Sequence, residues 1–173
     1  MSLFRSLIGE KFDALPAPIR ALHEIALPHR FEGRAIVRAA EGLIARTIAR
    51  MSGLPGRSVE TDIAVEIDRD GDGEIWTRHF PPRPMRTRLW REGDVLHERL
   101  GPIELRFRLD ADAGGIVWHP LSATSGGTPA PAAFLRGIHA RESVRNGRYH
   151  FDVGATLPWI GRVVAYDGWL HVD

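Results

Sequence analysis

The sequence predicts an α+β protein: N-terminal helices, then a strongly curved antiparallel sheet of about eight strands, a half-barrel or lipocalin-like barrel. The hydrophobic period changes near residue 56, from a helical stripe to alternation with period two. Turns rich in Gly, Asp and Pro separate the alternating segments at short intervals. With 173 residues and no long linker, we expect one domain over 1–173, mostly helical over 1–55 and antiparallel β over 56–173.

Three segments carry helix signals. Residues 2–9 and 18–25 predict two short helices, the second with Pro18 in its first turn. Residues 41–52 are the clearest helix, because their apolar side chains form one stripe and Gly and Pro follow. The stripe consists of Leu43, Ile44, Thr47, Ile48 and Met51. Between the second and third helix, β-branched residues in 31–39 favour a strand.

Eight further segments alternate apolar and polar residues as half-buried strands do. They are 59–67, 74–80, 85–91, 95–100, 103–110, 116–121, 149–153 and 162–172. The pattern is cleanest around Leu105 and Phe107, whose neighbours on the other face are charged. Residues 122–132 are rich in Ser, Thr, Gly, Ala and Pro and are expected to form a loop.

Two charged residues share the apolar faces of these strands. Side chains two residues apart in a strand lie on the same face, so Arg78 shares a face with Trp76 and Phe80. In the same way, Glu98 shares a face with Leu96 and Leu100. A buried charge is costly unless it is paired, so the two residues either form a structural ion pair or anchor a ligand. In the second case nearby aromatic residues supply an apolar wall. The candidate ligand-binding residues are Trp76, Arg78, Phe80, Glu98, Phe107 and Trp118.

The sequence assigns no catalytic residue. The chain has no cysteine, which excludes disulfides, thiolate metal sites and a cysteine nucleophile. It lacks the Gly-x-Ser-x-Gly elbow of serine hydrolases, a phosphate-binding loop and the Gly-x-Gly-x-x-Gly dinucleotide motif. We therefore expect no nucleotide or other cofactor.

One segment has part of a metal-binding pattern. Asp68–Ile75 matches the start of a calcium loop, but the twelfth position holds His79 where a glutamate is needed. A hairpin turn favours the same Asp and Gly residues. The eight histidines show no His-x-x-x-His spacing. We therefore expect a turn here and no metal site.

The charge balance limits the classes of partner. A net charge of +1 argues against DNA and against an anionic membrane. Arginines and aromatics mingle over 78–91, as in single-stranded nucleic acid sites, but alternation spreads them over both faces, so no nucleic acid is expected. The N-terminal apolar run is too short for a signal peptide, and no window approaches the ~18 apolar residues of a membrane span. A cytoplasmic protein is expected.

Several ordered motifs resemble a known family. They are Leu15-Pro16-Ala17-Pro18, Trp76-x-Arg78-x-Phe80, Glu98-Arg99-Leu100-Gly101-Pro102, Gly127-x-Pro129-x-Pro131, Phe151-Asp152-Val153 and Tyr166-x-Gly168-x-Leu170. Together they resemble a bacterial family of domains of unknown function. Its members occur alone or C-terminal to saccharopine-dehydrogenase-like NAD(P)-binding domains. The resemblance implies an independently folding accessory module and transfers no activity.

These observations favour a non-enzymatic module that holds a small amphipathic or anionic ligand in a barrel cavity. Arg78 would anchor the head group and Glu98 would orient it. A second hypothesis, implied by the resemblance, is a domain that docks on a separately encoded NAD(P)-dependent oxidoreductase. A third is an enzyme of unknown reaction with Glu98 or a histidine as general base. The sequence leaves all three open.

Overall fold

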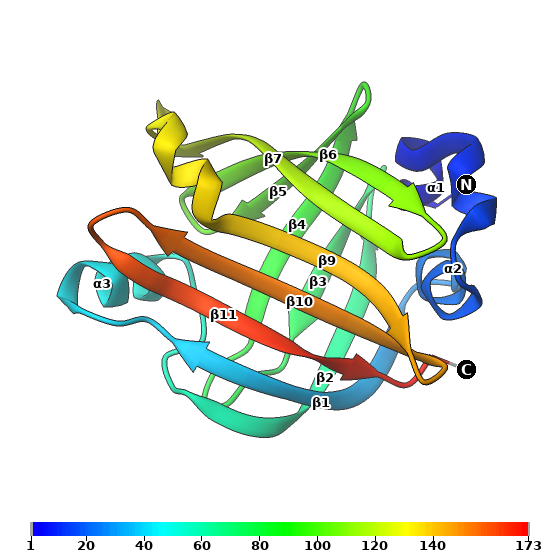
Figure 1. The fold of residues 1–173 in the computed structure, drawn as a ribbon, viewed down its shortest axis with the longest axis horizontal. Helices are drawn as coiled ribbons and strands as arrows, with labels where there is room; N and C mark the ends of the chain where they lie inside the picture. The colour runs from blue at the N-terminus through cyan, green and yellow to red at the C-terminus, as the bar shows by residue number, and fades with distance from the viewer. Residues whose placement is uncertain (1, 173) are drawn as a thin grey trace.

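The computed structural model describes residues 2–172 and shows a closed barrel of ten antiparallel strands (Figure 1). The barrel strands are β1 His29–Ala39, β2 Val59–Asp70, β3 Gly73–Arg78, β4 Met85–Glu92, β5 Val95–Leu100, β6 Ile103–Asp112, β7 Gly115–Ser125, β9 Ile138–Arg145, β10 Arg148–Leu157 and β11 Gly161–Leu170. A two-residue strand, β8 Thr128–Pro129, pairs with the end of β7. Each barrel strand pairs with the next, so the topology is an up-and-down meander.

Pairing between the first and last strands closes the barrel. β1 pairs with β2 on one side and, over Gly33–Ala39, with β11 on the other. The predicted α+β half-barrel of about eight strands is therefore wrong, because the protein is mostly β and ten strands close on themselves. The antiparallel, barrel-like character of the prediction is consistent with the structure.

Two local differences explain the strand count. The sequence pattern does not predict β9, because only Ile138, Ala140 and Val144 give its inner face an apolar character and the other residues are polar. β7 continues through part of the expected loop, since residues 122–125 pair with the start of β6. In both places backbone pairing with neighbouring strands overrides a weak local pattern.

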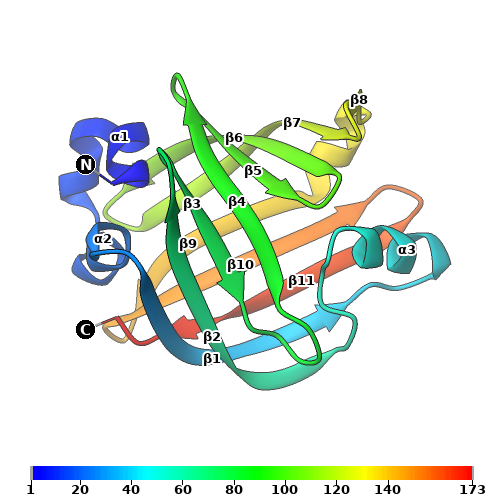
Figure 2. The same ribbon diagram turned by 180° about the vertical axis from the view of Figure 1, so that it is seen from behind.

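Three short helices close one end of the barrel: α1 Leu3–Ile8, the 3-10 helix η1 Gly9–Ala14 and α2 Ala17–Glu24 (Figures 1 and 2). Ser2 caps α1 by accepting a hydrogen bond from the Arg5 amide at 3.3 Å, and α2 has proline in its first turn. Both predicted N-terminal helices are confirmed. Their apolar side chains enter the core of the barrel, where Phe4, Phe12, Ile19 and Leu22 are fully buried.

α3, Leu43–Met51, lies at the opposite end between β1 and β2, on the same side as the 3-10 helix η2, Ala132–Gly137 (Figure 1). The predicted helix is confirmed, but of its large apolar side chains only Ile48 packs against the core, and Leu43, Ile44 and Met51 do not. The small residues Ala45 and Ala49 are buried instead. The exposed fractions are 83% for Leu43, 62% for Ile44 and 63% for Met51. No helix in residues 2–172, α3 included, is long and apolar enough to cross a membrane.

The seam between β1 and β11 makes Gly33 a sensitive position. A Cβ at Gly33 would lie 1.9 Å from the carbonyl oxygen of Trp169. We expect Gly33→Ala to lower the free energy of unfolding by about 1 to 3 kcal/mol, the usual cost of overpacking, as measured by chemical denaturation. Gly56→Ala is the control, since a Cβ there meets nothing within 4 Å. Equal losses in the two variants would contradict the steric argument.

Candidate functional site

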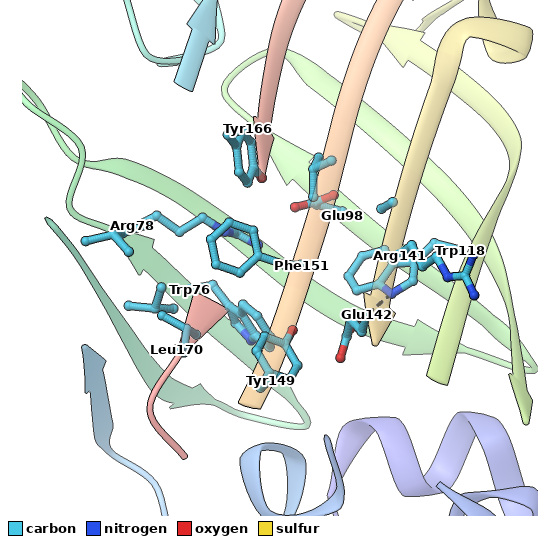
Figure 3. Close-up of a pocket in the computed structure, with 14 residues that line it drawn as sticks. Trp76, Arg78, Glu98, Trp118, Arg141, Glu142, Tyr149, Phe151, Tyr166 and Leu170 are labelled. Carbon is cyan, nitrogen blue, oxygen red and sulfur yellow. Dashed lines mark hydrogen bonds between the residues drawn. The ribbon is translucent and has the colours of Figure 1, made fainter. Parts of the chain in front are cut away.

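The barrel interior holds two neighbouring cavities. The inner cavity, about 50 Å³, lies towards the N-terminal helices and is lined by Trp76, Arg78 and Trp118 among others (Figure 3). The outer cavity, about 230 Å³, lies beside α3. Glu98 and Tyr166 line both cavities, so the two spaces adjoin one another.

Arg78 brings a guanidinium group into the inner cavity. Its side chain is buried, with a residue exposure of 8%, and its Nη1 donates a hydrogen bond to Thr87 Oγ1 at 3.1 Å. Its guanidinium carbon lies 5.2 Å from the ring centroid of Trp76. Within residues 2–172, the Thr87 bond is its one side-chain hydrogen bond, and no carboxylate lies within 4.0 Å. A guanidinium has five N–H donors, so this one retains donors for an anion.

Arg78 and Glu98 therefore do not form a direct ion pair, one of the two alternatives that the sequence left open. Burial raises the pKa of the Glu98 carboxyl, and the charge of Arg78 and a hydrogen bond from Thr87 oppose that rise only in part. A protonated Glu98 is neutral and can donate a hydrogen bond. The charge of Arg78 is then uncompensated, which suits a ligand with one negative charge.

A second polar cluster joins the helical end to the barrel. Glu142 on β9 is buried, and its Oε2 lies 2.7 Å from His23 Nε2 on α2. Trp118 Nε1 donates to Glu142 Oε1 at 3.1 Å, a bond that Figure 3 draws as a dashed line. Burial raises the pKa of the Tyr149 phenol well above its ordinary value, and the nearby charge of Glu142 raises it further. The hydrogen-bonding capacity of Glu142 is thus used by protein partners, whereas Arg78 keeps free donors for a ligand.

The outer cavity is almost entirely apolar. Its walls come from β5, β6, β7, β9, β10 and β11, and α3 and η2 contribute from the open end. The larger apolar side chains are Ile48, Leu100, Leu105, Phe107, Phe134 and Val164. Ser52 adds a polar group to this apolar lining. Its hydroxyl is buried and has no hydrogen-bond partner among residues 2–172. An inner cavity that holds the guanidinium of Arg78, beside an apolar outer cavity, matches the two ends of an amphipathic molecule.

The structure gathers most of the predicted site residues. Four of them, Trp76, Arg78, Glu98 and Trp118, line the inner cavity. Phe107 lines the outer cavity instead, and its ring lies 5.4 Å from that of Trp118. Phe80 lines neither cavity; it is buried with its ring 5.2 Å from Tyr166.

Sequence reasoning misses several residues of the interior. Glu142 sits between Ala140 and Val144 at period two, the same signal that identifies Glu98, but β9 itself is not predicted. Tyr149 and Tyr166 lie on predicted strands, where their parity alone does not single them out. No local pattern relates His23 to any strand, since α2 meets β9 only in the folded chain.

The segment that resembles a calcium loop forms the turn between β2 and β3, as predicted. Asp70 pairs with Gly73 across it, and Gly71 has a φ of 60°, which favours glycine. Asp70 Oδ2 accepts a hydrogen bond from Arg88 Nε at 2.5 Å. In the described part of the chain, no three His, Cys, Asp or Glu side chains lie close enough to hold a metal ion.

Comparison with known proteins identifies the family of this chain. Searches of curated proteins and of solved structures returned no significant match. A family model described as Domain of unknown function (DUF4166) matches residues 15–170. That span includes the motifs from Leu15-Pro16 to Tyr166-x-Gly168-x-Leu170. Because the match covers most of the sequence, this chain belongs to the family of domains of unknown function DUF4166.

Proposed function

We propose that this protein is a binding module that holds a small amphipathic anion inside its barrel. Arg78 binds the anionic head group in the inner cavity, and Glu98, whose pKa is raised by burial, donates a second hydrogen bond when it carries its proton. The apolar body of the ligand fills the outer cavity. The ligand-binding residues in this proposal are Trp76, Arg78, Glu98, Phe107 and Trp118. Phe80 does not contact the ligand but packs against Tyr166, which lines both cavities.

One observation carries the proposal. Arg78 is a buried cation with one hydrogen-bond partner and a cavity in front of it. A buried charge without a paired countercharge is costly, so a purely structural role would leave it poorly satisfied. A carboxylate or sulfonate in the inner cavity supplies the missing acceptors.

The test compares decanoate with decanol, which has the same chain without the charge. By calorimetric titration at neutral pH, we expect the protein to bind decanoate more tightly than decanol. Arg78→Met keeps an apolar stem and removes the charge. We expect it to weaken decanoate binding about tenfold to a hundredfold, the range for a hydrogen bond to a charged group, and to leave decanol binding nearly unchanged.

Arg86→Met is the matched control, because Arg86 lies exposed on the outer face of β4 and should not affect either ligand. Native mass spectrometry of gently purified protein gives a second measurement. A bound mass that disappears on denaturation, and is weaker in Arg78→Met, would identify the class of natural ligand. Equal affinity of Arg78→Met and the unaltered protein for decanoate would overturn the proposal.

The family resemblance suggests a second candidate function, docking on a separately encoded NAD(P)-dependent oxidoreductase. The exposed apolar side chains of α3 are the observation that favours a docking surface. With this function we would also expect a bacterial source and a cytoplasmic location. In this case the barrel would be an accessory module, and replacing the apolar residues of α3 would abolish the complex.

An enzymatic role is the third candidate, and Glu98 is the residue that favours it. Burial beside a cavity raises its pKa, as is common for a general base or acid. If Glu98 were catalytic, Glu98→Gln would abolish turnover of a bound substrate while leaving its affinity nearly unchanged. If it only positions the ligand, the same variant would change affinity.

A further inference from the structure

The two ends of the barrel differ in charge. The loops at the α3 end comprise residues 40–58, 79–84, 101–102, 126–137 and 158–160. They carry one carboxylate, Glu41, and five arginines, Arg46, Arg50, Arg57, Arg83 and Arg136. Glu41 is already bonded to Arg162, whereas all five arginines are exposed and none forms an ion pair within residues 2–172. The loops at the opposite end, mainly residues 2–28, 71–72 and 93–94, carry five carboxylates and three basic side chains.

The same end exposes large apolar side chains. Leu43, Ile44 and Met51 project from α3, and Trp159, in the turn between β10 and β11, is 92% exposed. An isolated exposed apolar residue needs no explanation, but four of them beside unpaired arginines form a patch with a defined chemistry. We call these four residues and the five arginines the α3-end face.

Backbone contacts hold this face together. The Glu41 amide, just before α3, donates to the Arg162 carbonyl at 2.9 Å, which ties the start of α3 to the turn that carries Trp159. At the other end of α3, a Cβ on Gly101 would lie 2.8 Å from the Met51 carbonyl oxygen. α3 therefore reaches from the β10–β11 turn to the β5–β6 turn. Ile48 on its inner side lines the outer cavity.

We propose that the α3-end face docks on the surface of an anionic lipid bilayer, with α3 lying in the plane of the interface. Helices that bind in this way expose large apolar side chains on one face and arginine or lysine beside them. Tryptophan favours the same interfacial depth. Docking places the outer cavity next to the membrane, which is a natural source of apolar and amphipathic molecules.

The charge pattern favours a lipid surface over a protein partner. Five arginines from three separate loops lie at the same end of the barrel as the apolar side chains, and the one carboxylate of these loops is already neutralised. A positively charged face of this kind suits a uniformly anionic surface. Each arginine contributes to binding there without needing its own specific partner. A protein partner would instead need a negative patch that matches the positions of these arginines.

The test is co-flotation of the whole protein with vesicles. We expect binding to vesicles of equal parts phosphatidylcholine and phosphatidylglycerol at about 0.1 M salt, and little binding to phosphatidylcholine alone. Binding should fall strongly at about 1 M salt, where the screening length shrinks from about 10 Å to about 3 Å. Emission of Trp159 should shift to shorter wavelength on binding, and the variant Trp159→Ser should lack this change.

Two double variants divide the face into its parts. Arg46→Gln with Arg50→Gln should weaken binding about 30-fold, about fivefold for each arginine. Leu43→Ser with Ile44→Ser should weaken it at least as much, through lost apolar burial. These side chains are exposed, so the folded state should persist, which circular dichroism would verify.

The control is Arg108→Gln with Val117→Ser, a charged and an apolar residue on the outer wall formed by β6 and β7. This variant should bind vesicles as the unaltered protein does. Three outcomes would overturn the inference: no binding to anionic vesicles at low salt, equal binding by the face and control variants, or docking of a protein through this face without any affinity for vesicles. None of these readouts depends on a ligand in the barrel, so the proposed function can fail separately.

Discussion

Replacing Glu142 by alanine is expected to lower the free energy of unfolding by about 2 to 6 kcal/mol, about 1 to 3 kcal/mol for each of two buried partners that it leaves unpaired. Glu142 accepts the hydrogen bond of Trp118 and lies 2.7 Å from the His23 ring nitrogen. All three side chains are buried, so its removal leaves two polar groups unpaired away from water. Chemical denaturation measures the loss.

The loss should be concentrated where Glu142 joins α2 to the barrel wall. Amide hydrogen exchange is expected to accelerate most over Ala17–Glu24, because His23 has no other hydrogen-bond partner among residues 2–172. Glu142→Gln, which keeps the volume and one acceptor oxygen, should lose less. Asp152→Ala on β10 is the control: its contact with His139 is exposed, so a change within about 0.5 kcal/mol is expected. A loss below about 1 kcal/mol for Glu142→Ala would show that the cluster contributes little.

Replacing Glu98 by glutamine is expected to stabilise the protein at pH 8, because burial disfavours the charged form of Glu98 in the folded state. The sign follows from the raised pKa of Glu98 in the folded state. The folded protein keeps a proton that the unfolded chain loses, so stability falls as pH rises from the ordinary carboxyl range to the folded pKa. Glutamine cannot ionise and avoids that loss.

The measurement is the difference in Tm between Glu98→Gln and the unaltered protein as a function of pH. The difference should be small near pH 4 and grow towards pH 8. Glu104→Gln is a control of opposite sign, since hydrogen bonds from Arg99 and His97 lower the pKa of Glu104. It should not stabilise the protein at any pH in this range. If the difference in Tm between Glu98→Gln and the unaltered protein did not change with pH, the charged form of Glu98 would not destabilise the folded state.

The same carboxyl should control ligand affinity. Besides Arg78, the ionisable groups around the inner cavity are Glu98, Glu142 and the phenols of Tyr149 and Tyr166, and Arg141 is exposed. Decanesulfonate stays charged throughout, so only the protein titrates. Its affinity should rise as the pH falls and Glu98 takes up its proton, and Glu98→Gln should remove this dependence.

Local alternation accounts for much of the barrel wall. It places Trp76, Arg78 and Glu98 on inner faces, and all three line the inner cavity. It does not predict β9, because only Ile138, Ala140 and Val144 give its inner face an apolar character and the outer residues are polar. Because β9 is not predicted, Glu142 is not predicted as a site residue either. Like Glu98, it lies between two apolar residues on the same face of its strand.

Net charge is a poor guide to the surface of this protein. A value of +1 argues against an anionic membrane, but it is a sum over the whole chain. Folding brings five unpaired arginines from three loops to one end of the barrel and leaves mixed charges at the other. The apolar stripe of α3 is similarly misleading, since such a stripe usually faces a core. Because Ala45 and Ala49 pack against the barrel, the larger side chains point outwards.

The sequence by itself determined the turns, the parity of the strands and the two charges on inner faces, since each depends only on neighbours along the chain. Only the tertiary structure decided that ten strands close into a barrel, because closure depends on pairing between β1 and β11, more than 100 residues apart. It also decided that Arg78 and Glu98 do not pair directly and that Glu142 meets His23. These contacts join segments remote in sequence, and their geometry is set by strand tilt and packing, which local residue patterns do not encode.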